Sequence, residues 1–245
     1  PHNGAMRLLA FETATEACSV AISVDGRVLE RFEIAPRRHA ELALPWAEVL
    51  LAEAGVARSQ LDAIAISRGP GAFTGVRLGI GVAQGIALAL DRPVIAVSTL
   101  AVLAEGVVGS LSQQVPEAGD HNVMAAIDAR MGEVYVGTFS RRAGDVVALM
   151  PEVVAKPEDV AVPEGSGWIA VGTGFAAADG ALRSRFADQL ARVDAQALPR
   201  AGHLVRLAEA AFARGEALAP ERVEPAYLRN NVALTLAEQQ RLRAG

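Results

Sequence analysis

The chain has 245 residues, a formal net charge of −5, 51% hydrophobic residues and 4% aromatic residues. This length allows one large domain or two smaller ones, and the hydrophobic content is sufficient for a sizeable core. No dense basic run occurs, although a protein that grips nucleic acid by itself usually carries a basic stripe. The composition therefore argues against tight direct binding to RNA.

Signals for metals, disulfides and membranes are weak. Cys18 is the single cysteine, which excludes a disulfide within the chain and is typical of the reducing cytoplasm. No two histidines have metal-ligand spacing, and no run reaches about 18 uninterrupted apolar residues, so we expect neither a zinc site nor a membrane span. The first five residues, PHNGA, lack a signal-peptide core and are interpreted as an expression remnant, residues 1–5.

The first half of the chain predicts strands and helices in alternation. Residues 7–14 predict a strand, and residues 17–34 predict two more strands around an Asp-Gly turn. A helix is expected from His39 to Gly55, where apolar residues follow helical spacing and glycine gives a C-terminal stop. The next predicted elements are a strand at 61–67, a helix at 73–90, a strand at 93–98 and a helix from Thr99.

The composition turns polar after Gly109, which makes this point the candidate boundary between two domains. The elements predicted beyond it are strands at 123–129, 132–139, 145–150 and 168–174 and an amphipathic helix at 201–215. The order of strands and helices thus occurs twice. We predict an α/β fold with two similar lobes, each a mixed sheet flanked by helices, at 6–109 and 110–218, followed by a C-terminal tail at 219–245.

The stretch SRGPGAFTGVRLGIGVAQGIALAL, residues 67–90, begins like a phosphate-binding loop. A Walker loop needs a lysine after its last glycine, and the dinucleotide pattern needs glycine where Thr74 stands, so a tight turn is the favoured interpretation. The helix that follows carries two rows of small residues. Gly75, Gly79, Ala83 and Ala87 form one row, and Gly81, Gly85 and Ala89 form the other.

Glycine inside a helix costs roughly 1 kcal/mol relative to alanine, so close approach by a neighbour should offset these rows. Spacing alone leaves two alternatives open, packing inside the lobe and contact with another subunit. Two carboxylates, Glu12 and Asp128, each end an apolar strand and could hold magnesium with phosphates, although turn capping is the favoured interpretation. Gly172 and Gly174 could let the backbone approach an adenosine.

Four segments carry a resemblance to a known family. ETATEACSVAI, the glycine-rich stretch above, AIDARMGEVYVGTF and EPAYLRNNVA together resemble the TsaB family, also called YeaZ, over residues 6 to about 233. The resemblance implies two lobes of the actin-like (ASKHA, ribonuclease H-like) superfamily. It also implies a non-catalytic but required subunit in the synthesis of threonylcarbamoyladenosine beside the anticodon of tRNA, with TsaC supplying threonylcarbamoyl-AMP.

The partners implied by the resemblance are the catalytic subunit TsaD and the ATPase TsaE, with a homodimer in isolation and tRNA reached only through the complex. No membrane is expected, the localisation is cytoplasmic, and no cofactor is expected in isolation, although ATP or ADP could sit at the complex interface. The partner interface implied on the two first-lobe helices comprises His39, Leu42, Trp46, Leu50, Arg77, Leu78, Gly81, Gln84, Gly85 and Leu88.

The sequence departs from the catalytic relatives at several positions. Thr99 and Leu103 stand where TsaD-like proteins have two metal-binding histidines, and Glu12 stands where the superfamily usually has Asp. The resemblance therefore implies a vestigial nucleotide site at Glu12, Thr13, Thr15, Asp128, Gly172 and Gly174. The alternatives are an active ATPase or small-molecule kinase of the same fold, and a glycoprotease-type peptidase.

Overall fold

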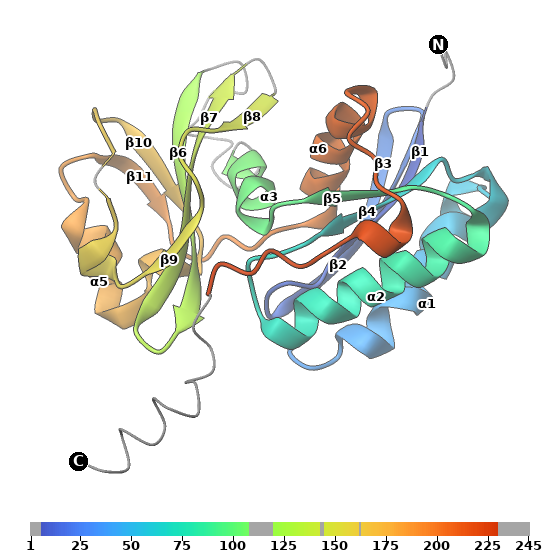
Figure 1. Cartoon of the computed structure of the whole chain (residues 1–245), viewed down its shortest axis with the longest axis horizontal. Coiled ribbons are helices and arrows are strands. Elements are labelled where there is room, and N and C mark those ends of the chain that lie inside the picture. The colour runs from blue at the N-terminus through green and yellow to red at the C-terminus, as the bar shows by residue number, and fades with distance from the viewer. Residues whose placement is uncertain (1–5, 108–119, 143–144, 162, 230–245) are drawn as a thin grey trace.

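The computed structural model describes residues 6–107, 120–142, 145–161 and 163–229. Two mixed sheets lie side by side with helices between them and on their outer faces (Figure 1). The first sheet has the strand order β3-β2-β1-β4-β5, and the second has the order β11-β10-β6-β7-β8 with β9 paired to β7. The predicted α/β fold with two lobes is confirmed.

In the first lobe, β1 pairs antiparallel with β2 and parallel with β4. An Asp25-Gly26 turn with positive φ at both residues joins β2 to β3, as its sequence predicted. The bounds are β1 Arg7–Glu12, β2 Ala17–Val24, β3 Arg27–Ile34, α1 His39–Ala54, β4 Ala63–Ser67, α2 Phe73–Leu90, β5 Val94–Val97 and α3 Thr99–Glu105.

The second lobe repeats the antiparallel start, since β6 and β7 form a hairpin, while β10 runs parallel to β6 and to β11. The bounds are β6 His121–Arg130, β7 Glu133–Arg142, β8 Asp145–Ala148, β9 Val153–Ala155, β10 Trp168–Val171, α5 Ala177–Arg185 and β11 Leu190–Asp194. Helix α6, Ala201–Ala213, follows β11 in the chain. The sequence did not predict β9, α5 or β11, because β9 and β11 are short and α5 has a predominantly polar sequence.

The helices divide the molecule into layers. Helices α1 and α2 cover one face of the first sheet, where Leu50 and Ile80 pack with Phe11. Helix α6 covers the opposite face together with α3, and α3 also packs against the second sheet. The far face of the second sheet is covered by α5 and the turns next to it. The first lobe therefore has one helical layer that faces outward and one that faces the second lobe.

Helix α6 corrects the predicted division of the chain. The sequence interpretation placed this helix in the second lobe, but its buried residues Leu204 and Val205 pack with Leu8 and Ala10 of β1. An amphipathic pattern shows that a helix has a buried side and does not show which sheet covers it. The boundary predicted near Gly109 lies outside the described residues and stays a prediction.

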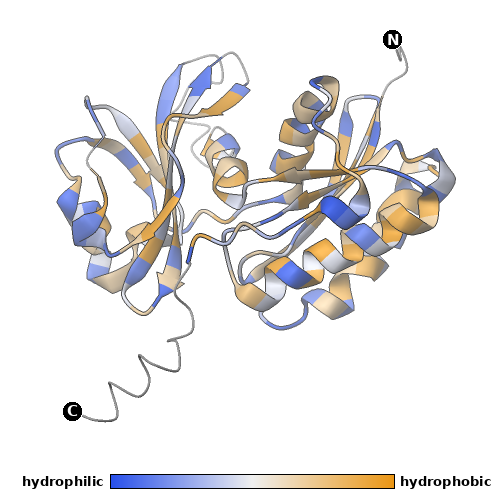
Figure 2. Ribbon diagram, in the orientation of Figure 1, coloured by the Kyte–Doolittle hydropathy of each residue, from blue (hydrophilic) through white to orange (hydrophobic). Residues whose placement is uncertain are grey.

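By length and composition, α2 is one described helix that could cross a membrane. The helix contains Arg77 and Gln84, so it is not an uninterrupted apolar run, and the expectation of no membrane span stays a prediction. A core helix passes the same test, and the inner side of α2 packs on the first sheet through Val76, Ile80 and Ala83. Figure 2 shows the hydrophobic colour along much of α2, broken by polar positions.

Candidate partner surface

The inner row of small residues on α2 lies against the turn between β1 and β2. A Cβ atom at Gly75 would be 2.1 Å from the carbonyl oxygen of Thr13, and one at Gly79 would be 2.4 Å from the Thr13 hydroxyl. The Thr13 hydroxyl donates a hydrogen bond of 2.8 Å to the Gly75 carbonyl. The backbone N–H of Ala72 donates to the Ala14 carbonyl at 2.7 Å. These glycines are therefore required inside the lobe.

The outer row of the same helix has no such neighbour. No atom lies within 4 Å of where a Cβ would be at Gly81 or at Gly85. Leu88 is 61% exposed and Phe73 is 66% exposed on this helix, and the adjacent α1 exposes Leu44 and Val49. Open backbone flanked by exposed apolar side chains is typical of a surface that another helix can approach closely.

In the structure, some predicted interface residues are exposed, some are half-buried, and two are buried and are described below. Gly81, Gly85 and Leu88 are exposed. A half-buried group borders them, consisting of Leu42, Trp46, Arg77, Leu78 and Gln84. We call these eight residues, together with Leu44, Val49 and Phe73, the outer helix surface. The sequence analysis did not select the last three.

Two predicted interface residues are corrected. His39 is 8% exposed, and its Nε2 atom lies 2.9 Å from the Thr15 carbonyl and 3.1 Å from the Ala17 carbonyl, so it anchors α1 to β2. Leu50 is 1% exposed and belongs to the core under the helices. Helical spacing selects the core-facing stripe of α1, whereas Leu44 and Val49 lie out of phase with that stripe.

Two residues of α2 hold a C-terminal strap, which we define as residues 218–229. The Gln84 side-chain amide donates to the Pro220 carbonyl at 2.8 Å and to the Val223 carbonyl at 3.3 Å. The Arg77 guanidinium lies 3.3 Å from the centre of the Phe73 ring and donates to the hydroxyl of Tyr227. The strap therefore borders the outer helix surface along much of its length.

Glu12 is fully buried at the end of β1. One of its carboxylate oxygens accepts the backbone N–H of Ala14 at 2.8 Å. Burial raises the pKa of Glu12 from 4.5 to about 7, with partial opposition from the Ala14 amide and the Ser67 hydroxyl. Glu12 thus caps its own turn. Thr15, in the same turn, accepts the Ala17 N–H at 3.4 Å.

Asp128 has the same local role in the second lobe. Its Oδ1 atom accepts the Arg130 N–H at 2.8 Å, and its Oδ2 atom lies 3.1 Å from the Arg130 guanidinium. The space that a Cβ would occupy at Gly172 and at Gly174 is filled by Ala126 of β6, at 2.2 Å and 2.6 Å. These two glycines therefore allow close packing between the end of β10 and β6.

The residues of the predicted nucleotide site thus make their contacts within the chain, and this arrangement does not fit a magnesium–nucleotide group. The turn between β1 and β2, where a superfamily phosphate loop would lie, is covered by the start of α2. Across residues 6–107, 120–142, 145–161 and 163–229, no group of three or more His, Cys, Asp or Glu is placed to hold a metal ion. The vestigial nucleotide site stays a prediction.

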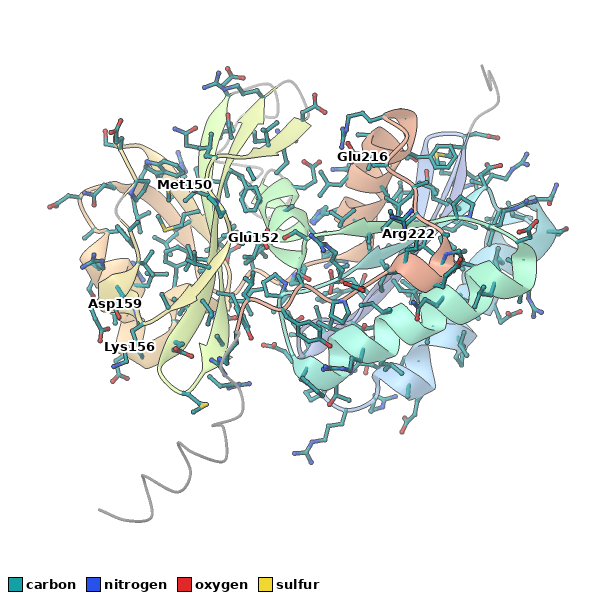
Figure 3. All side chains as sticks on the ribbon, viewed as in Figure 1. Met150, Glu152, Lys156, Asp159, Glu216 and Arg222 are labelled. Carbon is teal, nitrogen blue, oxygen red and sulfur yellow. The ribbon has the colours of Figure 1, made fainter. Side chains whose placement is uncertain are left out.

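Polar contacts join the lobes around α3. The Ser98 hydroxyl accepts the N–H of Leu100 at 3.1 Å at the start of α3 and donates to Glu152 of the second lobe (Figure 3). Glu105 at the end of α3 lies 3.4 Å from Arg141 of β7 and 3.7 Å from Arg206 of α6. Thr99 and Leu103 are buried between these contacts, so α3 serves as the packing element of the lobe junction.

A pocket of about 390 Å³ opens beside this junction. Its lining includes Phe32 and Ile34 of β3, Leu103, Arg200 and His203. Burial is the main reason that the pKa of His203 falls from 6.5 to about 4, so its imidazole is neutral at physiological pH. Arg200 stacks on the Phe32 ring at 4.0 Å and pairs with Glu30 at 2.9 Å, which already satisfies its charge.

The two mixed sheets with α3 and α6 between them define an actin-like α/β protein of two lobes. A family model described as tRNA N6-adenosine threonylcarbamoyltransferase, TsaD, matches residues 32–236. The protein named tRNA threonylcarbamoyladenosine biosynthesis protein TsaB of Escherichia coli is 43% identical over 237 residues, which span 93% of this chain and 96% of that relative. The chain belongs to the TsaB family.

Two further similarities agree with this assignment. The Haemophilus influenzae protein of the same name is 37% identical and matches over 93% of this chain and 95% of its own length. A crystal structure from Pseudomonas aeruginosa, described as an uncharacterized protein with similarity to peptidase YEAZ, has a TM-score of 0.82 and 47% identity. It covers 91% of this chain and 100% of its own. The resemblance read from the four segments is confirmed.

Proposed function

We propose that this chain is a non-catalytic, required subunit in the synthesis of threonylcarbamoyladenosine in tRNA. It docks through the outer helix surface onto a TsaD-type transferase, and the TsaE-type ATPase joins this pair. The names of the relatives support the pathway. The match to the transferase family supports the partner, because a chain that shares a fold with the transferase can pair equivalent helices with it.

The single observation that carries the docking proposal is the open outer row of α2. No atom from outside the helix backbone lies within 4 Å of where a Cβ would be at Gly81 or Gly85, although glycine in a helix is unfavourable, and apolar side chains flank both positions. A partner helix that lies along this row would offset that cost by close contact. In the absence of the transferase, the same row would support pairing of two copies of this chain.

The proposal of a non-catalytic role rests on the contacts that the residues of the predicted nucleotide site make within the chain. Thr13 is bonded to α2, while Glu12 and Asp128 accept backbone N–H groups of their own turns. These structural contacts explain why the residues are present, and no bound substrate is needed to explain them. We place the protein in the cytoplasm with its tRNA, which it would reach through the complex.

The test is reconstitution of the modification with purified proteins. TsaD, TsaE, TsaC, ATP, threonine, bicarbonate and an unmodified tRNA are incubated with and without this chain, and threonylcarbamoyladenosine is measured by mass spectrometry of the digested tRNA. We expect modified nucleoside only when this chain is present and expect it to co-purify with TsaD. Equal modification without the chain contradicts the required role.

The rival functions are tested on the isolated protein. An active ATPase, a small-molecule kinase or a peptidase would turn over its substrate alone, and a zinc enzyme would hold stoichiometric zinc by elemental analysis. We expect neither turnover nor zinc. Activity that rises with the zinc content would contradict the non-catalytic role.

A further inference from the structure

The hairpin between β6 and β7 has a tip that its own fold does not explain. Arg130 pairs with Glu133, so Met131 and Gly132 form a two-residue loop. The backbone has positive φ at three successive residues, 64° at Arg130, 58° at Met131 and 75° at Gly132. Such a loop strongly favours Asn-Gly, because asparagine tolerates the left-handed conformation better than an unbranched apolar residue does.

Met131 is also unfavourably placed with respect to solvent. It is 85% exposed, more than any other exposed large hydrophobic residue in the described chain. The left-handed conformation is unfavourable for methionine, and the exposed side chain gains no burial within the chain that would offset this cost. Unfavourable local geometry of this kind is found at functional sites, where the surroundings maintain it. The tip therefore points to a contact made outside the isolated chain.

The C-terminal strap joins this tip to α2. Arg229 at the end of the strap donates to the Ala129 carbonyl at 3.2 Å, pairs with Glu133 and lies 3.8 Å from the Met131 sulfur. Two residues earlier, Tyr227 is 56% exposed and accepts a hydrogen bond from Arg77 of α2. The strap is itself fixed to the first lobe, since the Ala226 N–H donates to the Arg68 carbonyl at 2.8 Å.

We define the ridge as Phe73, Arg77, Tyr227, Arg229 and Met131. Contacts join Phe73 and Tyr227 to Arg77 and join Arg229 to Met131, and the strap carries the chain from Tyr227 to Arg229, from the first lobe to the second. Aromatic residues, arginine and methionine are enriched at protein interfaces and supply many of their hot spots. Phe73 belongs to the ridge and to the outer helix surface. A partner on the outer helix surface that reaches the start of α2 would therefore meet the ridge.

We propose that the partner surface continues from α2 along this ridge to Met131, so that the transferase-type subunit contacts both lobes. This inference rests on the proposed function. Arg77 lies over the rings of Phe73 and Tyr227 and donates to the Tyr227 hydroxyl, and it has no ion pair among the described residues. Its charge would complement a carboxylate of the partner. Met131 inserts into an apolar depression of the partner, which explains its exposure in the isolated chain.

The test uses Met131→Asn and binding to purified TsaD by titration calorimetry, with thermal melts of each variant. Asparagine suits the turn, so we expect an equal or higher melting temperature together with about a tenfold weaker affinity. The matched control is Met150→Asn, the same change at an exposed methionine of the second lobe that is outside the ridge (Figure 3). We expect its affinity to stay within about twofold of the wild type.

The outcomes separate this inference from the proposed function. If Met131→Asn binds like the wild type while Gly85→Leu does not, the ridge proposal is wrong and docking on α2 stands. If Met150→Asn weakens binding as much as Met131→Asn, the effect is not specific to the ridge and the proposal is also wrong. If the wild-type chain does not bind TsaD, both proposals fall.

Discussion

The two sides of α2 carry the same kind of residue for different reasons. On the inner side, Gly75 and Gly79 leave space for the backbone and hydroxyl of Thr13. On the outer side, Gly81 and Gly85 face open space. The inner glycines are explained by the fold of the lobe, and the outer glycines are not. The comparison shows that a small residue in a helix becomes informative about partners only when its neighbours are known.

The largest predicted effect comes from inserting the same bulky residue on each side. Gly75→Leu should destabilise the protein by on the order of 4 kcal/mol, because even its Cβ overlaps the Thr13 backbone, which cannot move away as a side chain could. Gly85→Leu should leave the free energy of unfolding unchanged or slightly higher. Chemical denaturation of both variants measures the difference. Equal losses of stability would show that both sides are interior.

A second prediction concerns pH and the turn that the inner glycines contact. The pKa of Glu12 is raised from 4.5 to about 7, so the folded chain holds this proton more tightly than the unfolded chain. The resulting stabilisation is complete below pH 4.5 and is lost as the pH rises through 7. A shift of this size corresponds to about 3 kcal/mol. The outer side of α2 has no buried titratable group comparable to Glu12. The stability effect of a substitution on that side should therefore not depend on pH in this range.

Glu12→Gln removes the titration and keeps an acceptor for the Ala14 N–H. The difference in the free energy of unfolding between wild type and Glu12→Gln should fall by about 3 kcal/mol between pH 4.5 and pH 8. His203 acts in the opposite sense, since its pKa is lowered to about 4 and acidification below 6.5 destabilises the fold. His203 is present in both proteins, so its effect cancels in the difference. A difference that stays constant with pH would show that Glu12 is ionised in the fold.

The smallest predicted effect sharpens the comparison further. Gly85→Ala should stabilise the isolated chain by up to about 1 kcal/mol, because alanine is the better helix former and the added methyl group meets no atom. Gly79→Ala should not show this gain, since its methyl group would lie 2.4 Å from the Thr13 hydroxyl. Melting temperatures of the two variants test this. A gain for both would mean that the inner contact is loose.

Much of the fold follows from the sequence, because strand alternation and helical spacing report burial directly. The hairpin at Asp25-Gly26 and the length of α2 are examples. The lobe to which α6 belongs could not be predicted, since the contacts of Leu204 with β1 span nearly the whole chain. The same limit applies to His39, whose two carbonyl partners lie on β2 and in the turn before β2.

The candidate surface was predictable in outline and not in detail. Spacing separated the two rows of small residues but could not tell which row packs inside the lobe. The ridge depends on Tyr227 and Arg229 crossing to residues that are 150 and 96 positions away, Arg77 and Glu133. No local pattern reports such contacts. Exposure of Phe73 and Met131 likewise becomes visible only when the layers are assembled.

The most direct test of the account is titration of purified TsaD with three forms of this chain, wild type, Gly85→Ala and Gly85→Leu, after their melting temperatures have been measured. The account predicts three native melts, near-normal affinity for the alanine variant and at least about a tenfold loss for the leucine variant, because only leucine prevents close helix approach. Wild-type affinity in the leucine variant, with its melt intact, would contradict docking on the outer side of α2.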